Sequence, residues 1–342
     1  MSERERQIAA FLAEAGWGGI PLRTMTGDAS FRRYARLVGA DGRRAVLMDA
    51  PPPQENVGPF TALARHLLAL QLSAPKILAA DIEAGLLLLE DFGDGNMARL
   101  VDGNGCGAGN SDREALYALA VDTLIALHGH ARALEAPAPP FTEERLLREV
   151  GFVLDWYWPA LTGNPAPQSL REDYLALWRR LIPEARRAPD SLVLFDFFPD
   201  NLMLIEGRAG VAACGLLDFQ DAVIGPLTYD LVSLLEDARR DVPADLQARM
   251  RARYLAAFPE LDRDGFDASY VTMGAQRNLR IVGVFTRLCV RDRKPGYLRH
   301  LPRVWRLVEQ DVSHPVLAPL KAWLDEHIGP AMRRIPPCEA AA

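Results

Sequence analysis

The stretch LFDFFPDN, residues 194–201, contains side chains whose types and spacing suit chemistry. Asp196 and Asn201 stand five positions apart. At this spacing, phosphoryl-transfer loops carry an aspartate that accepts the proton of the attacked hydroxyl and an asparagine that holds a metal ion. The spacing raises the hypothesis of a phosphoryl-transfer loop with Asp196 as the base. Because the pattern is short, these residues alone leave open the alternative that Asp196 caps a strand and Asn201 belongs to a turn.

A second aspartate, Asp218, extends this pattern. The run GLLDFQDA is apolar up to Asp218, which follows Asp196 by 22 positions that read as loop, strand, glycine-containing turn and strand. A hairpin of this length can fold back and bring Asp218 close to the loop before it. Two carboxylates and a carboxamide are hard oxygen ligands, suited to a Mg²⁺ ion that carries phosphate oxygens. We therefore expect Asp196, Asn201 and Asp218 to converge on one point.

The composition limits the class of protein. The 342 residues suit two lobes better than one small core, and 49% hydrophobic with 25% charged residues is typical of a globular protein. The apolar stretches are far shorter than the roughly 20 residues of a membrane helix, and the charged N-terminus has no signal-peptide core. The net charge of −6 argues against nucleic acid as the main partner. We expect a cytoplasmic protein that binds neither membrane nor nucleic acid, and the oligomeric state stays open.

The first 93 residues predict a small, mostly antiparallel sheet with one helix packed on it. An N-terminal helix over 3–16 precedes several strand-like runs, and residues 59–72 read as the packed helix. The Asp41-Gly42 pair has the sequence of a hairpin turn. The buried run GLLLLEDFG ends this part. We predict a β-rich N-terminal lobe over residues 1–93 that ends in a short connection.

The rest of the chain is mainly helical. Four long segments with apolar residues three and four apart predict helices, and two shorter helices near 302–312 and 315–328 close the fold. The hairpin that carries Asp218 is the exception. We therefore predict an α+β fold of two lobes, with a C-terminal lobe over residues 94–330 and a disordered tail over residues 331–342.

The stretch LVLFDFFPDNLML…GLLDFQDAVIGPLTYDLVSLLEDARRDVP resembles the core of the aminoglycoside phosphotransferase and choline kinase superfamily, which has the protein-kinase-like fold. Within it, the likeness is strongest to the bacterial anomeric kinases that phosphorylate N-acetylmuramate and N-acetylglucosamine at C1 during cell-wall recycling. The runs GDASFRRYARL, VLMDAPPP, LLLLEDFGD, FVLDWYW, RNLRIVGVFTRL and KPGYLRHLPRVW also resemble that group, in the same order. The likeness extends from Ile8 to Trp323.

The resemblance implies a sugar kinase that uses ATP and Mg²⁺, with a role for each matching position. Asp196 would be the catalytic base, and Asn201 and Asp218 would hold Mg²⁺. The run TGDASFRRY would replace a glycine-rich loop over the ATP phosphates. In that loop, Gly27 and Ser30 would let the backbone approach the phosphates closely.

The run LEDF would be the hinge, with backbone groups of Glu90 and Phe92 meeting adenine. The letters DFG at Asp91–Gly93 spell the metal motif of protein kinases, but they precede the catalytic loop by about a hundred residues. Asp218 in DFQ is therefore the counterpart of that motif. Asp230 opens a predicted helix and is expected to be structural, tied to the catalytic loop.

The N-terminal lobe departs from the usual kinase pattern. Met48 stands where a kinase strand carries the lysine that clamps ATP, and no lysine precedes Lys76. An arginine must then supply the positive charge near the phosphates. We predict Arg33 for this role, in preference to Arg32 and Arg36.

The catalytic loop departs as well, because the His-Arg that precedes the base in protein kinases is Leu194-Phe195 here. The two departures leave room for a pseudokinase that binds nucleotide without turnover. The intact Asp196, Asn201 and Asp218 favour an active enzyme, because a decayed kinase has no reason to keep the base and both metal ligands.

An arginine-rich segment bears on the acceptor. Arg277, Arg280, Arg287 and Arg291 share one helix face, either as a solvated surface or as a border of the cleft. At the cleft they would disfavour a polycationic acceptor and favour a neutral or acidic one, such as N-acetylmuramate with its carboxylate. We name Arg280 and Asp221 as candidate substrate-binding residues, although Asp221 also suits a structural role. A kinase for another small acceptor, such as an amino alcohol, an aminoglycoside or another sugar, stays the alternative.

Overall fold

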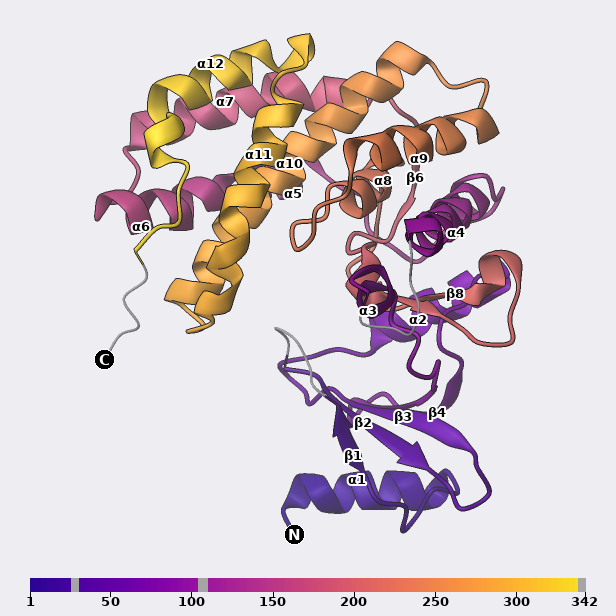
Figure 1. Cartoon of the computed structure of the whole chain (residues 1–342). Coiled ribbons are helices and arrows are strands. Elements are labelled where there is room, and N and C mark those ends of the chain that lie inside the picture. Colours follow the sequence, from indigo (N-terminus) through magenta and orange to yellow (C-terminus); the bar gives the residue numbers. More distant parts are fainter. Residues whose placement is uncertain (26–30, 104–109, 338–342) are drawn as a thin grey trace. The chain divides into compact units, whose positions relative to one another are not determined.

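The computed structural model describes residues 1–25, 31–103 and 110–337 (Figure 1). The chain divides into two compact units. Unit 1 comprises Met1–Ala138 and Pro199–Ala222, and unit 2 comprises Pro139–Phe198 and Val223–Ala342. The hairpin that carries Asp218 therefore belongs to the same compact unit as the N-terminal sheet. The lobe boundary at residue 93 stays a prediction.

Unit 1 is built on a five-stranded antiparallel sheet in the order β1-β2-β3-β5-β4. Its strands are β1 (Arg23–Met25), β2 (Arg33–Val38), β3 (Arg44–Asp49), β4 (Ile77–Asp81) and β5 (Leu86–Glu90). Gly42, with a φ of +82°, closes the β2–β3 hairpin, because glycine enters this left-handed region without strain. The β-rich, antiparallel N-terminal part predicted from the sequence is confirmed.

The two faces of this sheet are different. Alternate residues of a strand point to opposite faces, and on one face Leu37, Leu47 and Leu88 form a buried cluster with Phe11 and Leu12. The last two belong to α1 (Glu3–Glu14), which lies next to the sheet in Figure 1. The sequence predicted this helix. Its apolar side chains, three and four residues apart, are what cover the sheet.

The remaining elements of unit 1 hold the hairpin that carries Asp218. The helices are α2 (Gly58–Ala69), α3 (Met97–Val101) and α4 (Asn110–His128), and the hairpin strands are β7 (Leu202–Leu204) and β8 (Cys214–Leu216). Single bridges connect Ser73 to Gly215 and Asn96 to Met203. Phe92 packs on Met203 and Ile205 in a second apolar cluster. These contacts, with partners more than a hundred residues apart in sequence, attach the hairpin to the rest of unit 1.

Unit 2 is mainly helical and also contains a two-stranded sheet of β6 (Asp190–Val193) and β9 (Val223–Pro226). Its helices are α5 (Glu143–Phe152), α6 (Trp158–Thr162), α7 (Gln168–Ala185), α8 (Thr228–Leu235), α9 (Ala244–Ala257), α10 (Arg263–Val290), α11 (Leu301–Asp311) and α12 (Ala318–His327). The sequence analysis missed β6, β9 and α9. The two strands have four residues each, too few to show alternation, and α9 carries polar residues around most of its surface.

The centre of unit 2 is α10, which packs against α5, α7, α8 and α11 (Figure 1). Gly283 lets α10 approach the preceding helices closely, because a Cβ at this position would lie 2.3 Å from the carbonyl carbon of Phe152. No helix among the described residues is long and apolar enough to cross a membrane.

The chain after α12 is bound to unit 2. The guanidinium of Arg333 donates to Asp325 at 2.7 Å and to Glu309 at 3.0 Å, and the backbone N–H of Arg334 donates to the hydroxyl of Tyr157. The sequence predicted a disordered tail over residues 331–342, whereas Met332, Arg333 and Arg334 make specific contacts. Residues 338–342 lie outside the described part of the chain.

A buried pair of carboxyl groups lies beside α10. The amide of Asn278 donates to Glu236 at 2.8 Å and to Asp311 at 3.0 Å, and all three side chains are buried. Burial raises the pKa of Glu236 to about 7. Burial, together with the charge of Glu236, raises the pKa of Asp311 well above its usual range. The pair therefore holds a proton near neutral pH.

This pair predicts a pH dependence of stability. A carboxyl whose pKa is higher in the folded chain stabilises fully below its unfolded pKa, near 4.5 for Glu236, and this contribution is lost as the pH rises through about 7. Glu236 and Asp311 should both lower the free energy of unfolding over this range, together by an amount on the order of a few kcal/mol. Denaturant unfolding between pH 4.5 and 7 measures the slope.

The matched variant is Glu236→Gln, whose side chain keeps an oxygen for Asn278 and gains an amide donor for Asp311. We expect the variant to fold and to show a flatter dependence on pH than the wild type. Identical slopes in the two proteins would show that Glu236 takes up no proton on folding.

Candidate active site

The loop predicted to be catalytic begins with a strained turn. Phe195 has a φ of +75°, and the N–H of Asp196 donates to the carbonyl of Leu194 at 3.0 Å. A hydrogen bond between residues two apart, around a positive φ, makes a γ-turn of the rare, strained form. Bulky residues seldom adopt this conformation, and such strain is concentrated at functional sites. The turn presents Asp196, which is half-buried, in unit 2.

A buried carboxylate holds this turn in place. Asp230 of α8 accepts hydrogen bonds from the backbone N–H groups of Leu194 and Phe195. Complete burial raises the pKa of Asp230 to about 7, although the two N–H donors act to lower it, and the charge of Asp196 raises it further. These contacts lie between Asp230 and the loop, not at the start of its own helix. Asp230 is therefore placed to support the backbone of the loop, in agreement with the structural role expected for it.

Phe195 stands where the catalytic loop of a protein kinase carries an arginine, and two arginines from other elements lie against its ring. The ring stacks on Tyr229 with centroids 5.0 Å apart. The guanidinium groups of Arg145 and Arg280 lie 4.4 and 4.7 Å from its centroid. Both arginines also contact the buried carboxylate of Glu149, at 2.9 and 3.5 Å. Two helices, α5 and α10, therefore bring arginines to the place where a protein kinase carries one within the loop.

The arginine face of α10 is not a solvated surface along its length. Arg277 is only 4% exposed, and Arg280 lies against Phe195. Arg287 packs over the ring of Phe152. The alternative of a solvated face is therefore wrong for these three arginines, and a direct contact of Arg280 with substrate stays a prediction.

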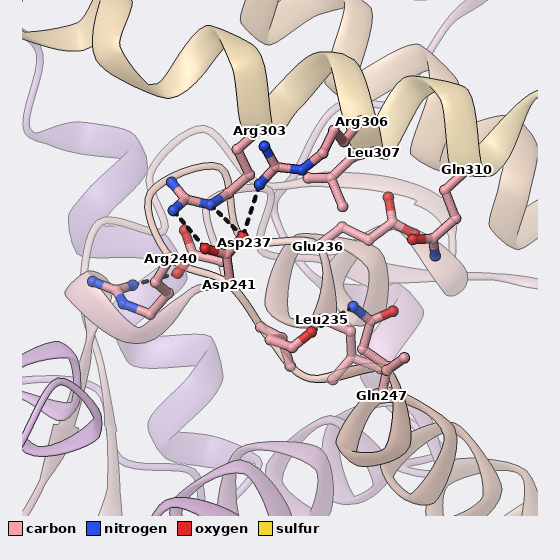
Figure 2. Close-up of a pocket in the computed structure, with 12 residues that line it drawn as sticks. Leu235, Glu236, Asp237, Arg240, Asp241, Gln247, Arg303, Arg306, Leu307 and Gln310 are labelled. Atoms are coloured by element: carbon pink, nitrogen blue, oxygen red, sulfur yellow. Dashed lines mark hydrogen bonds and ion pairs between the residues drawn. The ribbon is translucent and has the colours of Figure 1, made fainter.

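Two further arginines, Arg303 and Arg306 of α11, line a polar hollow of about 170 Å³ (Figure 2). Arg303 donates to both carboxylate oxygens of Asp241 at 2.8 Å, and Arg306 donates to the same carboxylate at 3.2 Å. Arg240 binds Asp237 on the same loop. The positive charges of this hollow are thus matched by carboxylates of the protein itself.

The two predicted metal ligands lie at the same end of the β7–β8 hairpin, in unit 1. The strand register pairs Leu202 with Leu216, and the N–H of Leu217 donates to the carbonyl of Asn201 at 3.0 Å. Asp218 follows directly and has a φ of +56°, a second strained position. The hairpin therefore brings Asn201 and Asp218 together, as its sequence predicted.

The donors at this hairpin end fit Mg²⁺. The carboxylate of Asp218 is 43% exposed and accepts hydrogen bonds from Arg32 at 3.3 Å and from Gln220 at 2.9 Å. A carboxylate and an amide oxygen suit this ion, which is usually held by one or two carboxylates together with water and phosphate oxygens. Asp221 is exposed next to Gln220, and its role stays a prediction.

Of the residues that the sequence predicted to bind the nucleotide phosphates, the structure describes only Arg33. Gly27 and Ser30 lie outside the described residues. Arg33 is 64% exposed and forms an ion pair with Asp49 at 2.6 Å, whereas its neighbour Arg32 is the arginine that reaches Asp218. The sequence analysis preferred Arg33, and the contacts favour Arg32.

The predicted hinge follows β5. The N–H of Glu90 donates to the carbonyl of Lys76 at 2.8 Å, and its carboxylate binds Arg208. A contact of this segment with adenine would therefore use other backbone groups than the N–H of Glu90. Phe92 is 8% exposed and belongs to the apolar cluster under the β7–β8 hairpin. Adenine binding at the hinge stays a prediction.

Sequence reasoning missed Glu55, which binds Arg32 near Asp218, and Glu149, which binds two arginines near Phe195. Glu55 accepts from Arg32 at 3.0 Å, and Glu149 binds Arg145 and Arg280. The spacing of Arg145 and Glu149, four residues apart on a helix, was the available signal for one of these pairs. The Arg32–Glu55 pair had no such signal.

Comparison with known proteins gives the family. Residues 21–266 match the model of the phosphotransferase enzyme family. The chain belongs to this family, as the resemblance of its motifs predicted.

Curated relatives cover nearly the whole chain. It is 35% identical to the N-acetylmuramate/N-acetylglucosamine kinase of Caulobacter vibrioides, with 97% of this chain and 99% of that protein covered. It is 39% identical to the protein of the same name from Pseudomonas aeruginosa, with 91% and 90% covered.

Solved structures show the same fold at low identity. A choline/ethanolamine kinase family protein from Mesorhizobium loti has a TM-score of 0.62 and 14% identity, covering 94% of this chain and 99% of that one. The GDP complex of wild-type aminoglycoside 2'-phosphotransferase-IIIa has a TM-score of 0.55 and 16% identity, covering 91% and 99%. These likenesses confirm the predicted α+β, protein-kinase-like fold class.

The contact of Asp230 with the loop predicts the effect of its removal. In Asp230→Ala the N–H groups of Leu194 and Phe195 would lose their acceptor inside the protein. We expect a loss of about 3 kcal/mol in the free energy of unfolding and faster hydrogen exchange in peptides that span 190–198. Asp245→Ala, which removes an exposed carboxylate of unit 2, is the control and should change neither quantity appreciably. Unchanged exchange in the Asp230 variant would mean that the turn is held by other groups.

Proposed function

We propose that this protein is an ATP-dependent kinase that phosphorylates a hydroxyl of an amino sugar, N-acetylmuramate or N-acetylglucosamine. The observation that carries this proposal is the strained turn, held by Asp230, that presents Asp196 five residues before Asn201. The relatives that share 34–39% identity with the chain over most of its length are named for kinases of these two sugars.

The hydroxyl attacked is the anomeric one at C1, as the resemblance of the motifs implies. The charges near the loop support an acceptor that is neutral or acidic. Arg145 and Arg280 lie against Phe195, the residue before the proposed base, and a polycationic acceptor would be repelled by them. N-acetylmuramate differs from N-acetylglucosamine by a lactyl ether with a carboxylate, so both sugars satisfy this condition.

In the proposed reaction Asp196 accepts the proton of the acceptor hydroxyl as that oxygen attacks the γ-phosphorus of ATP. The bond between the γ-phosphorus and the bridging oxygen breaks, and ADP leaves. The hydrogen bonds from Leu194 and Phe195 to Asp230 fix the backbone directly before Asp196 and so orient the carboxylate of Asp196 before substrate arrives. Asn201 and Asp218 hold Mg²⁺, which supplies neutralisation of the phosphate charge when it is bound. Gly27, Ser30 and the segment at Glu90–Phe92 bind the nucleotide.

An acceptor assay tests the function. ADP release with Mg-ATP should be measured with N-acetylmuramate, N-acetylglucosamine, choline and an aminoglycoside, and phosphorus NMR should identify the product. We expect turnover of the two amino sugars and a product phosphorylated at C1. The guanidinium groups of Arg145 and Arg280 next to Phe195 would disfavour the cationic acceptors. Turnover of choline or the aminoglycoside alone would establish another kinase. Nucleotide binding without turnover of any acceptor would favour the pseudokinase.

The role of Asp196 has its own test. In Asp196→Asn the affinity for ATP should stay close to that of the wild type, while kcat falls by about 10²- to 10⁴-fold, because a general base acts in the transition state. Asp190→Asn, which neutralises an exposed carboxylate at the start of β6, is the control and should retain kcat. If the Asp196 variant kept full kcat, another group would be the base.

A further inference from the structure

The pairing of β2 and β3 decides which arginine lies on the face of Met48, the position of the missing lysine. The register pairs Tyr34 with Met48 and Arg33 with Asp49. Paired residues of an antiparallel sheet lie on the same face, and neighbours along a strand lie on opposite faces. Arg32 lies directly before β2, two positions ahead of Tyr34, and the alternation of the strand continued to this residue places it on the face of Met48. Arg33 lies on the other face.

Arg33 is bound to the face that α1 covers. Its guanidinium lies 2.6 Å from the carboxylate of Asp49, which is itself only 6% exposed. The same carboxylate accepts from Arg4 of α1 at 2.6 Å. Arg33 therefore completes an ion-pair cluster beneath the sheet, away from the face that carries Met48.

Arg32 connects two segments on the face of Met48. Its Nε donates to Glu55 at 3.0 Å, and its Nη1 lies 3.3 Å from the carboxylate of Asp218, the proposed metal ligand. Only 13% of each of the Arg32 and Glu55 side chains is exposed. The pair is therefore largely shielded from water, which makes its geometry more fixed than that of a surface ion pair. All three residues belong to unit 1.

The same set of contacts defines the phosphate-binding cation of protein kinases. There a lysine on the third strand is held by a glutamate and lies next to the metal-binding aspartate. Met48 cannot supply this charge, and its side chain is buried at 1% exposure. A guanidinium carries five N–H donors in a planar fork that matches phosphate oxygens, so one arginine can contact Glu55 and also meet a nucleotide.

We propose that Arg32, positioned by Glu55, is the cation that binds the α- and β-phosphates of the nucleotide, in the place of the absent lysine. This inference rests on the nucleotide site of the proposed function. Asp218 is 43% exposed, so a metal ion and a phosphate reach the Arg32–Asp218 contact without opening a buried core. Glu55 is a positioning residue, since it acts through Arg32.

The test is the dependence of affinity on phosphate, measured by calorimetry with adenosine, AMP and ADP, with EDTA and then with Mg²⁺. In the wild type we expect ADP to bind more tightly than adenosine. In Arg32→Ala we expect adenosine affinity to be unchanged and ADP affinity to fall by about 10- to 100-fold, the loss of a hydrogen bond to a charged group. An unchanged ratio of ADP to adenosine affinity in this variant overturns the proposal.

Four further variants sharpen the result. Arg32→Lys should recover part of the lost ADP affinity, because lysine keeps the charge without the planar fork. Glu55→Gln should lower ADP affinity less than Arg32→Ala and leave adenosine affinity unchanged. Arg43→Ala, which removes an exposed arginine at the β2–β3 turn, is the control. Its ratio of ADP affinity to adenosine affinity should equal that of the wild type. If Arg33→Ala lost the phosphate dependence and Arg32→Ala kept it, the prediction from sequence would stand and the inference would fall.

The outcomes separate this inference from the proposed function. A wild type that binds ADP through Arg32 but phosphorylates neither amino sugar would refute the function and keep the inference. A wild type that phosphorylates the sugars while Arg32→Ala keeps its preference for ADP would do the reverse. If Arg32→Ala does not fold, as judged by circular dichroism, the ratios of Arg32→Lys and Glu55→Gln decide, and wild-type ratios in both overturn the proposal.

Discussion

The hydrogen bonds from two backbone N–H groups to the buried carboxylate of Asp230 are the constraint on which the candidate site depends. A γ-turn with a phenylalanine at positive φ is unfavourable by itself, and it persists only where surrounding contacts over-determine it. Asp230 accepts from Leu194 and Phe195, and the stacked Tyr229 fixes the ring of Phe195. The desolvation of Asp230 is the cost of this arrangement. Its result is a fixed backbone on the N-terminal side of Asp196.

The arginines near the loop and the sheet stand at other sequence positions than the arginine and the lysine of protein kinases. The loop has Phe195 in place of an arginine, and Arg145 and Arg280 reach this ring from α5 and α10. The sheet has Met48 in place of a lysine, and Arg32, the residue directly before the neighbouring strand β2, lies on the same face. A binding site needs a charged group at a certain place in the folded chain, and residues at different sequence positions can supply that group.

Each of these arginines is held by a glutamate. Glu149 binds Arg145 and Arg280, and Glu55 binds Arg32. A long flexible side chain in water loses conformational freedom when it binds an anion, and a partner carboxylate removes part of that loss in advance. Glu149 and Glu55 therefore position the arginines that they bind, although neither glutamate belongs to a recognisable sequence motif.

The sequence alone determined the fold class and the candidate base and metal ligands, because these depend on local properties: apolar periodicity, the Asp41-Gly42 turn, and the fixed spacing of Asp196 and Asn201. Tertiary structure decided what depends on partners far apart in the chain. Leu192 pairs with Ile224 in the β6–β9 sheet, and Arg32 reaches Asp218 across 186 positions. The choice between Arg32 and Arg33 followed from strand register, where a shift of one residue reverses the face. Register is set by pairing across the sheet, so neighbouring arginines that are equivalent in sequence become different in the folded chain.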